Sequence, residues 1–285
     1  SACIGASGVV SPNNDFAHLT NVQWDVKSDE LIEETSLNSV FIINDFQTIG
    51  YGINLLDSKN KNDIFPVRIK KEKGDHKETK AIIGAGTGLG KCILLFDKSY
   101  NAYIPIASEG GHGDFPVYNT YERDLVNFVK KLRNIKHPLT YEELLSGRGL
   151  ESIYLYLRNS ENFKVSKYTE EIDCSTDKSA LISKFKNKDE TCYETFRLFA
   201  RFYGRCAKNF VLDSLATGGL YIAGGIASKN TEIFSIKEFL NEFENAYRRS
   251  NILEKVPIYI IINYDVSIYG ACFAAMYNLN KLSGK

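Results

Sequence analysis

The stretch KAIIGAGTGLGKCILLFD, residues 80–97, contains two apolar runs joined by a glycine-rich loop. Short apolar runs rich in β-branched residues are typical of buried strands. We therefore predict a strand over 80–83, a turn over 84–90 and a second strand over 91–97, which together form a hairpin. In such a turn, backbone N–H groups freed by glycine can bind phosphate oxygens, and Thr87 adds a hydroxyl donor. Taken alone, the loop is also consistent with a purely structural turn.

This loop differs from the two common nucleotide-binding fingerprints. The P-loop pattern GxxxxGK[ST] is absent from it. The pattern GxGxxG begins at Gly84 and Gly86, but its last position is Leu89, and a strand rather than a helix is expected to follow. The sequence therefore indicates neither a P-loop protein nor a Rossmann protein.

Apolar runs and helical spacings alternate along the rest of the chain. Further strands are expected at 2–6, 40–43, 219–223 and 256–262, and helices at 120–136, 150–157, 193–215, 232–248 and 268–280. The polar, broken segment 158–190 is expected to form surface connections. Alternating strands and helices place the chain in the α/β class, and 285 residues are enough for two lobes or domains.

Composition argues against several classes of protein. Lys+Arg and Asp+Glu both number 35, so the formal charge is zero, whereas general nucleic-acid binders carry a basic excess. The six cysteines include no CxxC pair and the histidines number four, so we expect neither a metal site built from protein ligands nor a disulfide framework. Free thiols fit a reducing compartment, and we expect a cytoplasmic protein. No apolar run reaches the ~18 residues of a membrane helix, so no membrane partner is expected.

A polar pair, Asn44-Asp45, follows the apolar run 40–43. Sheets of α/β proteins usually bind their ligands at the carboxyl ends of the strands. An aspartate there can act as a general base, and an asparagine can both donate to and accept from a hydroxyl-rich ligand. A helix cap formed by the aspartate is the alternative interpretation.

Two further stretches combine glycine with ligand-binding potential. In SEGGHGDF, residues 108–115, Glu109 can accept and His112 can donate hydrogen bonds, and the glycines between them let both reach adjacent sugar hydroxyls. Gly224 and Gly225 lie between a predicted strand and a predicted helix, where glycine lets a flat ring approach the backbone. A polar turn and an ordinary strand-to-helix turn are the respective alternatives.

Together, these stretches resemble the bacterial-type glucokinases. The matching segments, in chain order, are TNVQW, INDF, GAGTGLG, EGGHGDF, ELLSGRGL and YIAGGI. These kinases belong to the hexokinase, actin and Hsp70 superfamily of two-lobed ATP-binding proteins. The resemblance implies a ribonuclease-H-like (actin-like ATPase) fold. Its small lobe, with the catalytic base, would comprise 1–55 and 266–285, and its large lobe, with ATP and further sugar contacts, 56–265.

The resemblance also implies the sugar side of the site. Asp45 matches the catalytic base of the family, which accepts the proton of the reacting hydroxyl. The residues that match the glucose-binding positions are Asn44, Glu109, His112 and Glu142, with the adjacent Glu143 as the alternative to Glu142. Asp114 is expected to hold the loop in place rather than to touch the substrate.

On the nucleotide side, the resemblance implies ATP with Mg²⁺. Phosphates would be held by Gly86, Thr87 and Gly88, and adenosine by Gly224 and Gly225. The implied activity is phosphorylation of glucose to glucose 6-phosphate in glycolysis, by a homodimer. The alternatives are a kinase for another hexose or an amino sugar, and a non-catalytic sugar-binding or regulatory relative.

The sequence departs from the family in two places. The N-terminal phosphate motif DxGGTxxR is absent, and Ser267 stands where the family favours glycine in its near-C-terminal turn. We therefore expect a small lobe that is incomplete at its N-terminus, as in a fragment of a longer chain, with a split polypeptide or a shortened relative as alternatives. Such a chain is expected to bind glucose weakly and to phosphorylate it poorly or not at all.

Overall fold

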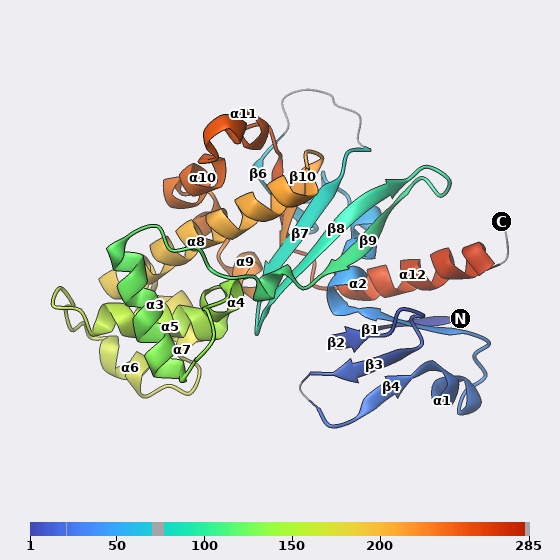
Figure 1. Ribbon diagram of the computed structural model, residues 1–285, viewed down its shortest axis with the longest axis horizontal. Helices are drawn as coiled ribbons and strands as arrows, with labels where there is room; N and C mark the ends of the chain where they lie inside the picture. Colours follow the sequence, from blue (N-terminus) through green and yellow to red (C-terminus); the bar gives the residue numbers. More distant parts are fainter. Residues whose placement is uncertain (21, 70–76, 283–285) are drawn as a thin grey trace.

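The computed structural model describes residues 1–20, 22–69 and 77–282, so Asn21 of the TNVQW segment lies outside the described residues. Its largest element is a six-stranded mixed sheet, which crosses the upper centre of Figure 1. In spatial order the strands are β6 (Ile64–Arg68), β11 (Ile258–Ile261), β10 (Gly219–Ala223), β7 (Lys80–Ala85), β8 (Leu89–Asp97) and β9 (Ala102–Ser108). The central strand β7 pairs in parallel with β10 and antiparallel with β8.

The predicted glycine hairpin is confirmed by the pairing of β7 and β8. Gly84 of β7 lies opposite Gly90 of β8. Ala81 and Ile83 face one apolar core, whereas Ile82 between them faces another. A strand that is buried on both faces needs a continuous apolar run, which is why the sequence indicated it.

A thick helical layer covers one face of this sheet and forms the main apolar core. The longest helix, α8 (Glu190–Ser214), runs across the sheet in Figure 1 and agrees with its prediction to within three residues at each end. The other helices of this layer are α3 (Thr120–Arg133), α4 (Tyr141–Leu144), α5 (Gly147–Arg158), α6 (Thr169–Asp173), α7 (Lys178–Phe185), α9 (Gly225–Lys229), α10 (Lys237–Glu244) and α11 (Ser250–Leu253). Within the described residues, none of the helices has the length and apolar character needed to span a membrane.

Two predictions for this layer were wrong. The segment 158–190, expected to consist of surface connections, contains α6 and α7, which bury Ile172 and Ile182 in the main core. The segment 232–248, expected to be one helix, consists of α10, which ends at Glu244, with a short 3₁₀ turn before it and another after it. In both segments the helices are short, and the few apolar residues of each are enough to pack it against the main core.

Two helices, α2 (Asp45–Gly52) and α12 (Val266–Leu282), separate the large sheet from two small ones (Figure 1). One small sheet pairs β1 (Ala2–Ala6) with β5 (Val40–Asn44) in parallel, and the other contains β2 (Gly8–Val10), β3 (Phe16–Leu19) and β4 (Asp25–Lys27), followed by α1 (Ser28–Glu33). Ile49 of α2 packs against the core of the large sheet, whereas Tyr51 of the same helix packs with Ile43 of β5. Helix α2 therefore contributes to both cores.

The contact that joins α2 to the hairpin is made by Phe46. A Cβ atom at Gly90 would overlap the Phe46 ring, and one at Gly84 would lie 2.8 Å from its Cζ atom. The ring thus lies directly on the backbone of the paired glycines. Glycine is required here because any side chain would occupy the volume of the ring.

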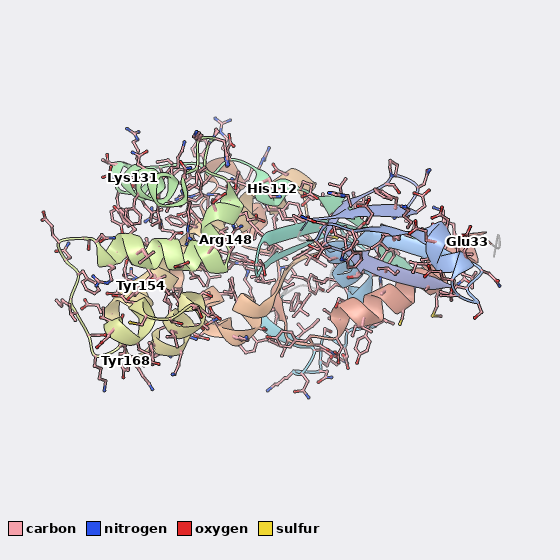
Figure 2. All side chains as sticks on the ribbon, turned by 90° about the horizontal axis from the view of Figure 1, so that it is seen from below. Glu33, His112, Lys131, Arg148, Tyr154 and Tyr168 are labelled. Atoms are coloured by element: carbon pink, nitrogen blue, oxygen red, sulfur yellow. The ribbon has the colours of Figure 1, made fainter. Side chains whose placement is uncertain are left out.

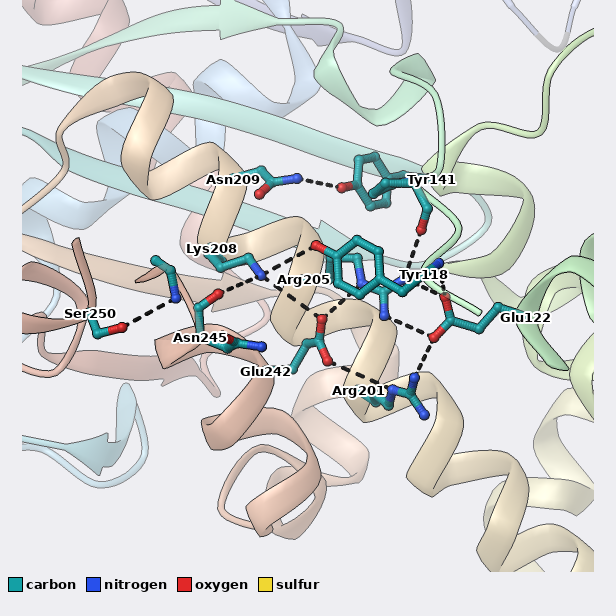
Figure 3. Close-up of polar contacts among 12 residues, drawn as sticks. Tyr118, Glu122, Tyr141, Arg201, Arg205, Lys208, Asn209, Glu242, Asn245 and Ser250 are labelled. Atoms are coloured by element: carbon teal, nitrogen blue, oxygen red, sulfur yellow. Dashed lines mark hydrogen bonds and ion pairs between the residues drawn. The ribbon is translucent and has the colours of Figure 1, made fainter. Parts of the chain in front are cut away.

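A buried charge network fixes α8 to the elements around it (Figure 3). Arg205 of α8 is fully buried and donates to both carboxylate oxygens of Glu122 on α3, at 2.8 and 2.9 Å. It also donates to Glu242 on α10 at 2.8 Å and to the carbonyl of Pro116 at 2.7 Å. These hydrogen bonds and ion pairs offset the free-energy cost of burying the charged guanidinium.

The Phe46 contact predicts that Gly90→Ala destabilises the protein by about 1–3 kcal/mol, the usual cost of overpacking. In a Phe46→Ala background the same substitution should cost much less, because the ring that it displaces has gone. Urea denaturation of the four chains of this double-mutant cycle measures the coupling.

Gly86→Ala is the matched control, since a Cβ there meets nothing within 4 Å. We expect it to change stability by no more than about 0.5 kcal/mol. Equal costs of Gly90→Ala with and without Phe46 would contradict the proposed contact.

Candidate active site

Asn44 and Asp45 lie at the junction of β5 and α2. Asn44 is the N-cap of the helix: its Oδ1 accepts the Phe46 N–H at 2.9 Å, and its own N–H donates to Gln47 Oε1 at 3.1 Å. The cap is therefore formed by Asn44 and not by the aspartate, which the alternative interpretation had expected to cap the helix; Asp45 is the first helical residue. Capping uses the amide oxygen of Asn44 and leaves its nitrogen as a donor for a ligand.

Asp45 is a half-buried carboxylate in a site that disfavours its charge. Burial raises the pKa of Asp45 above its ordinary value, and the charge of Glu109 acts in the same direction. Hydrogen bonds from the Phe46 N–H and the Ser7 hydroxyl oppose this rise in pKa without cancelling it. The INDF and EGGHGDF segments, distant in sequence, are thus close enough for the charge of Glu109 to act on Asp45.

The EGGHGDF segment forms a loop with a 3₁₀ turn over Gly110–His112. His112 Nε2 lies 3.7 Å from Glu109 Oε2, and both side chains are largely exposed. Figure 2 shows His112 near the middle of the molecule, between the helical layer on the left and the small sheets on the right. The pair is therefore accessible from solvent, and its contact with sugar hydroxyls stays a prediction.

The backbone of this loop is held on two sides. A Cβ at Gly111 would overlap the carbonyl oxygen of Leu89 in the hairpin. The carbonyl of Gly113 accepts the Tyr141 N–H at 2.9 Å, and Asp114 forms a backbone bridge with Thr140. Asp114 thus holds the loop through its main chain.

Glu142 is tied to the hairpin. Its Oε2 accepts the Leu89 N–H at 2.9 Å, and a Cβ at Gly88 would lie 2.5 Å from the same oxygen. Of Glu142 and its alternative Glu143, it is Glu142 that contacts the hairpin. One oxygen is used by the hairpin, and Oε1 makes no hydrogen bond within the part of the chain described.

A cavity of about 420 Å³ opens on the other side of the hairpin tip. Among its lining residues are three of the five predicted for the nucleotide, Gly86, Thr87 and Gly225. Gly225 and Gly86 present open backbone, since a Cβ at either meets nothing within 4 Å. Asp45, Glu109, His112 and Glu142 are not part of this lining, so the hairpin separates a polar site from a cavity of ligand size.

The other two predicted nucleotide residues shape the turns. Gly88 faces Glu142, as described above. Gly224 has a φ of +92°, and a Cβ there would lie 2.5 Å from the carbonyl oxygen of Ala85. A residue with a side chain would be both strained and crowded at Gly224, so its first requirement is structural.

Sequence reasoning missed one wall of the cavity. That wall comes from the start of α7 and the end of α9, and includes Thr176, Asp177, Lys178, Ser179, Ser183, Lys229 and Asn230. Asp177 is the N-cap of α7, because its Oδ1 accepts the Ala180 N–H at 3.1 Å. An Asp followed by a short apolar run is a helix-start signal and could have revealed this wall.

The floor of the cavity is joined to the hairpin through α5. The Gly147 N–H at the start of α5 donates to the carbonyl of Gly86 at 2.9 Å. Arg148, the next residue, lines the cavity and lies near the centre of Figure 2. With Lys178 and Lys229 it gives the cavity three cationic side chains against two carboxylates, those of Glu151 and Asp177, and this positive excess suits an anionic ligand.

Among the described residues, no group of three or more His, Cys, Asp and Glu side chains is arranged to hold a metal ion. Magnesium in kinase sites usually keeps several waters and is bound through one or two carboxylates together with substrate phosphates. The residues present therefore fit a metal that arrives with a nucleotide rather than one held in a protein cage.

The arrangement of the elements is the actin-like ATPase fold that solved glucokinases share. A family profile described as glucokinase matches residues 1–278. The chain belongs to the glucokinase family.

Known relatives agree with this assignment. The glucokinase of Nostoc punctiforme is 35% identical over 288 residues, a match that covers 96% of this chain and 81% of the relative. The glucokinase of Colwellia psychrerythraea is 32% identical over 275 residues, covering 95% and 78%. The sequence-based resemblance to glucokinases is thus confirmed.

Solved structures confirm the fold. The glucokinase of an Antarctic psychrotroph has a TM-score of 0.76 at 24% identity and is matched over 95% of this chain and 79% of its own. The glucokinase of Balamuthia mandrillaris in complex with glucose has a TM-score of 0.80 at 22% identity, over 96% and 77%. At these identities the likeness concerns the arrangement of the elements.

The raised pKa of Asp45 predicts a stability effect that depends on pH. A carboxyl whose folded-state pKa is raised stabilises the fold most when it is protonated, and this stabilisation is lost as the pH rises through the folded pKa. Asp45→Asn should therefore increase the free energy of unfolding at pH 7. The gain should shrink as the pH falls toward the ordinary aspartate pKa of 3.8.

Urea denaturation of both chains between pH 4.5 and pH 7 measures this difference. Glu161→Gln is the control, because that carboxylate is exposed and lies outside the site, so it should show no comparable gain. A variant Asp45→Asn that is less stable than the natural chain at pH 7 would refute this account of the site.

Proposed function

We propose that this protein phosphorylates the 6-hydroxyl of D-glucose with ATP and releases glucose 6-phosphate and ADP. One observation carries the proposal: a single hairpin, Gly84 to Gly90, separates a site rich in carboxylates from a cavity of nucleotide size. Asp45 is tied to that hairpin by the neighbouring Phe46. A phosphoryl group at the hairpin tip would therefore lie between the nucleotide and the base.

In this proposal Asp45 is the catalytic base. It accepts the proton of the sugar hydroxyl as that oxygen attacks the γ-phosphorus in line with the departing ADP oxygen. A raised pKa brings a carboxylate closer to the operating pH, which favours its use as a base. The remaining catalysis comes from positioning and from neutralisation of phosphate charge.

The sugar would be held by groups of complementary hydrogen-bonding character. Glu109 accepts from hydroxyls, and His112 can donate to them. Asn44 offers its amide nitrogen, and Glu142 offers the oxygen that the hairpin leaves free. A hexose ring with adjacent hydroxyls, each both donor and acceptor, matches this set.

The nucleotide would occupy the cavity behind the hairpin. Backbone N–H groups at Gly86, Thr87 and Gly88, with the Thr87 hydroxyl, would hold the phosphates, and Gly224 and Gly225 would border the adenosine. Arg148 and Lys178 would add positive charge to this side. Mg²⁺, bound mainly through the phosphates, would neutralise charge on the transferred group.

Three broader assignments belong to the same proposal. The lobes are proposed as 1–55 with 266–285 and 56–265, although α2 packs against both cores. A cytoplasmic location is supported by the six free cysteines. A role in glycolysis and a homodimeric state rest on the family relationship.

The full-length protein should form glucose 6-phosphate from glucose and ATP in a coupled assay, and Asp45→Asn should lower the turnover number by about 10²–10⁴. The reason is that an amide keeps the shape of the carboxylate but cannot accept the proton. Faster phosphorylation of another hexose or an amino sugar would reassign the substrate. Glucose binding without turnover would indicate a non-catalytic relative.

The separation of the two subsites predicts opposite ligand effects for two variants. Gly225→Leu should abolish binding of a non-hydrolysable ATP analogue, because its side chain enters the cavity, while glucose binding and stability are retained. Glu109→Gln should weaken glucose binding by about tenfold or more and leave the nucleotide unaffected. Isothermal titration calorimetry with each ligand tests this, and equal losses for both ligands in either variant would contradict the separation.

A further inference from the structure

Lys91 of β8 is a buried lysine beside the sugar loop. Its exposed fraction is 5%, and its Nζ donates to the carbonyl oxygen of Gly110 at 2.8 Å. The same nitrogen lies 5.1 Å from the centre of the Tyr141 ring and 5.2 Å from that of Phe210. No carboxylate forms an ion pair with it among the described residues.

A buried ammonium without a carboxylate partner is costly, because it loses its hydration and gains no opposite charge. The nearby Cys206 thiol does not supply that charge. Burial raises the pKa of Cys206 to about 11, although Lys91 acts in the opposite direction. The ammonium is thus compensated by a carbonyl oxygen, two aromatic faces and a neutral thiol.

The carbonyl that Lys91 binds belongs to the peptide between Gly110 and Gly111, inside the loop that carries Glu109 and His112. The N–H of Gly110 is held as well, since it donates to Ser108 Oγ at 3.2 Å. Gly111 is confined by the carbonyl of Leu89. The loop that carries the exposed Glu109 and His112 is therefore held by Lys91 of β8 and Ser108 of β9.

Lys91 also touches the second sugar-side element. Tyr141, whose ring faces the ammonium, is the residue before Glu142 and begins α4. The ring is fixed at its other end, because the Tyr141 hydroxyl accepts a hydrogen bond from Asn209 at 2.8 Å. One buried charge thus contacts both the loop of Glu109 and His112 and the helix of Glu142.

We propose that Lys91 is a positioning residue of the sugar site, which sets the places of Glu109, His112 and Glu142 without touching the substrate. This inference rests on the proposed function of the site. It assigns to a buried strand residue a specific effect on sugar affinity.

Lys91→Met is the decisive variant, because it keeps the unbranched apolar stem of the side chain and removes the ammonium. Its dissociation constant for glucose, measured by calorimetry on the full-length protein, should rise about ten- to hundredfold. Its dissociation constant for a non-hydrolysable ATP analogue should change less than about twofold, since Lys91 does not line the nucleotide cavity. A purely structural role would weaken both ligands alike.

Lys208→Met is the matched control. Lys208 is also 5% exposed and also donates to a backbone carbonyl, that of Asn245, at 3.0 Å, but it lies in the charge network of Figure 3. It should lower stability and leave the glucose affinity unchanged. Ser108→Ala, a milder change at the other main-chain group of Gly110, should weaken glucose binding in the same direction as Lys91→Met and provides the test if that variant does not fold.

Hydrogen exchange without ligand separates this inference from the proposed function. The amides of 110–113 should exchange at least tenfold faster in Lys91→Met, and at natural rates in Lys208→Met. Unchanged exchange, or an unchanged glucose affinity, would overturn the role of Lys91. If the natural protein binds no glucose, the proposed function fails, and the exchange rates still decide whether Lys91 orders the loop.

Discussion

The site depends on the contact between the Phe46 ring and the paired glycines of the hairpin. Because Gly84 and Gly90 have no side chains, the Phe46 ring rests on their backbone. Only this ring then separates the main chain of α2 from that of the hairpin at this point. Asp45 precedes Phe46, so the position of the carboxylate is set by the packing of its neighbour. Asp45 and the glycine turn are therefore parts of one rigid unit, although about 40 residues of sequence separate them.

The hairpin backbone organises the rest of the site in the same way. The Leu89 N–H binds Glu142, the Leu89 carbonyl confines Gly111, and the Gly86 carbonyl accepts the Gly147 N–H. Each contact uses a main-chain group of the hairpin at or near its tip. The proposed sugar side and nucleotide side are thus both attached to the same turn, and a displacement of the turn would move the residues of both.

Beneath this frame, the charge network around Arg205 supplies a rigid base. Breaking a buried ion pair by removal of one partner costs about 3–5 kcal/mol, because the other charge is left uncompensated. Arg205 binds Glu122 of α3, Glu242 of α10 and the carbonyl of Pro116, so it joins both helices to the segment just beyond the EGGHGDF loop. The exposed pair Glu109 and His112 can therefore face solvent while the chain on either side of it is fixed.

Sequence reasoning succeeded where a single local pattern determines the outcome. The β7–β8 hairpin, the strand before Asn44 and the helix α8 follow from apolar spacing. It chose Glu142 over the alternative Glu143 only through the family resemblance, because the contact with Leu89 depends on how the one-turn helix α4 meets the hairpin. It also missed the cavity wall at α7, whose few apolar residues become informative only once the main core is known to receive them.

Lys91 shows why the remaining part of the site lies beyond local patterns. In sequence it is a charged residue at the start of a strand, where a solvent-facing position is the ordinary expectation. In the fold its side chain passes inward to the Gly110 carbonyl, and the Tyr141 ring covers the ammonium. A lysine is present at position 91 because its ammonium binds the carbonyl of Gly110, almost twenty residues later. That carbonyl comes within reach only because β9 pairs with β8. Side chains that bind ligand can be recognised by their chemistry, whereas those that position them are identified by the contacts that the folded chain creates.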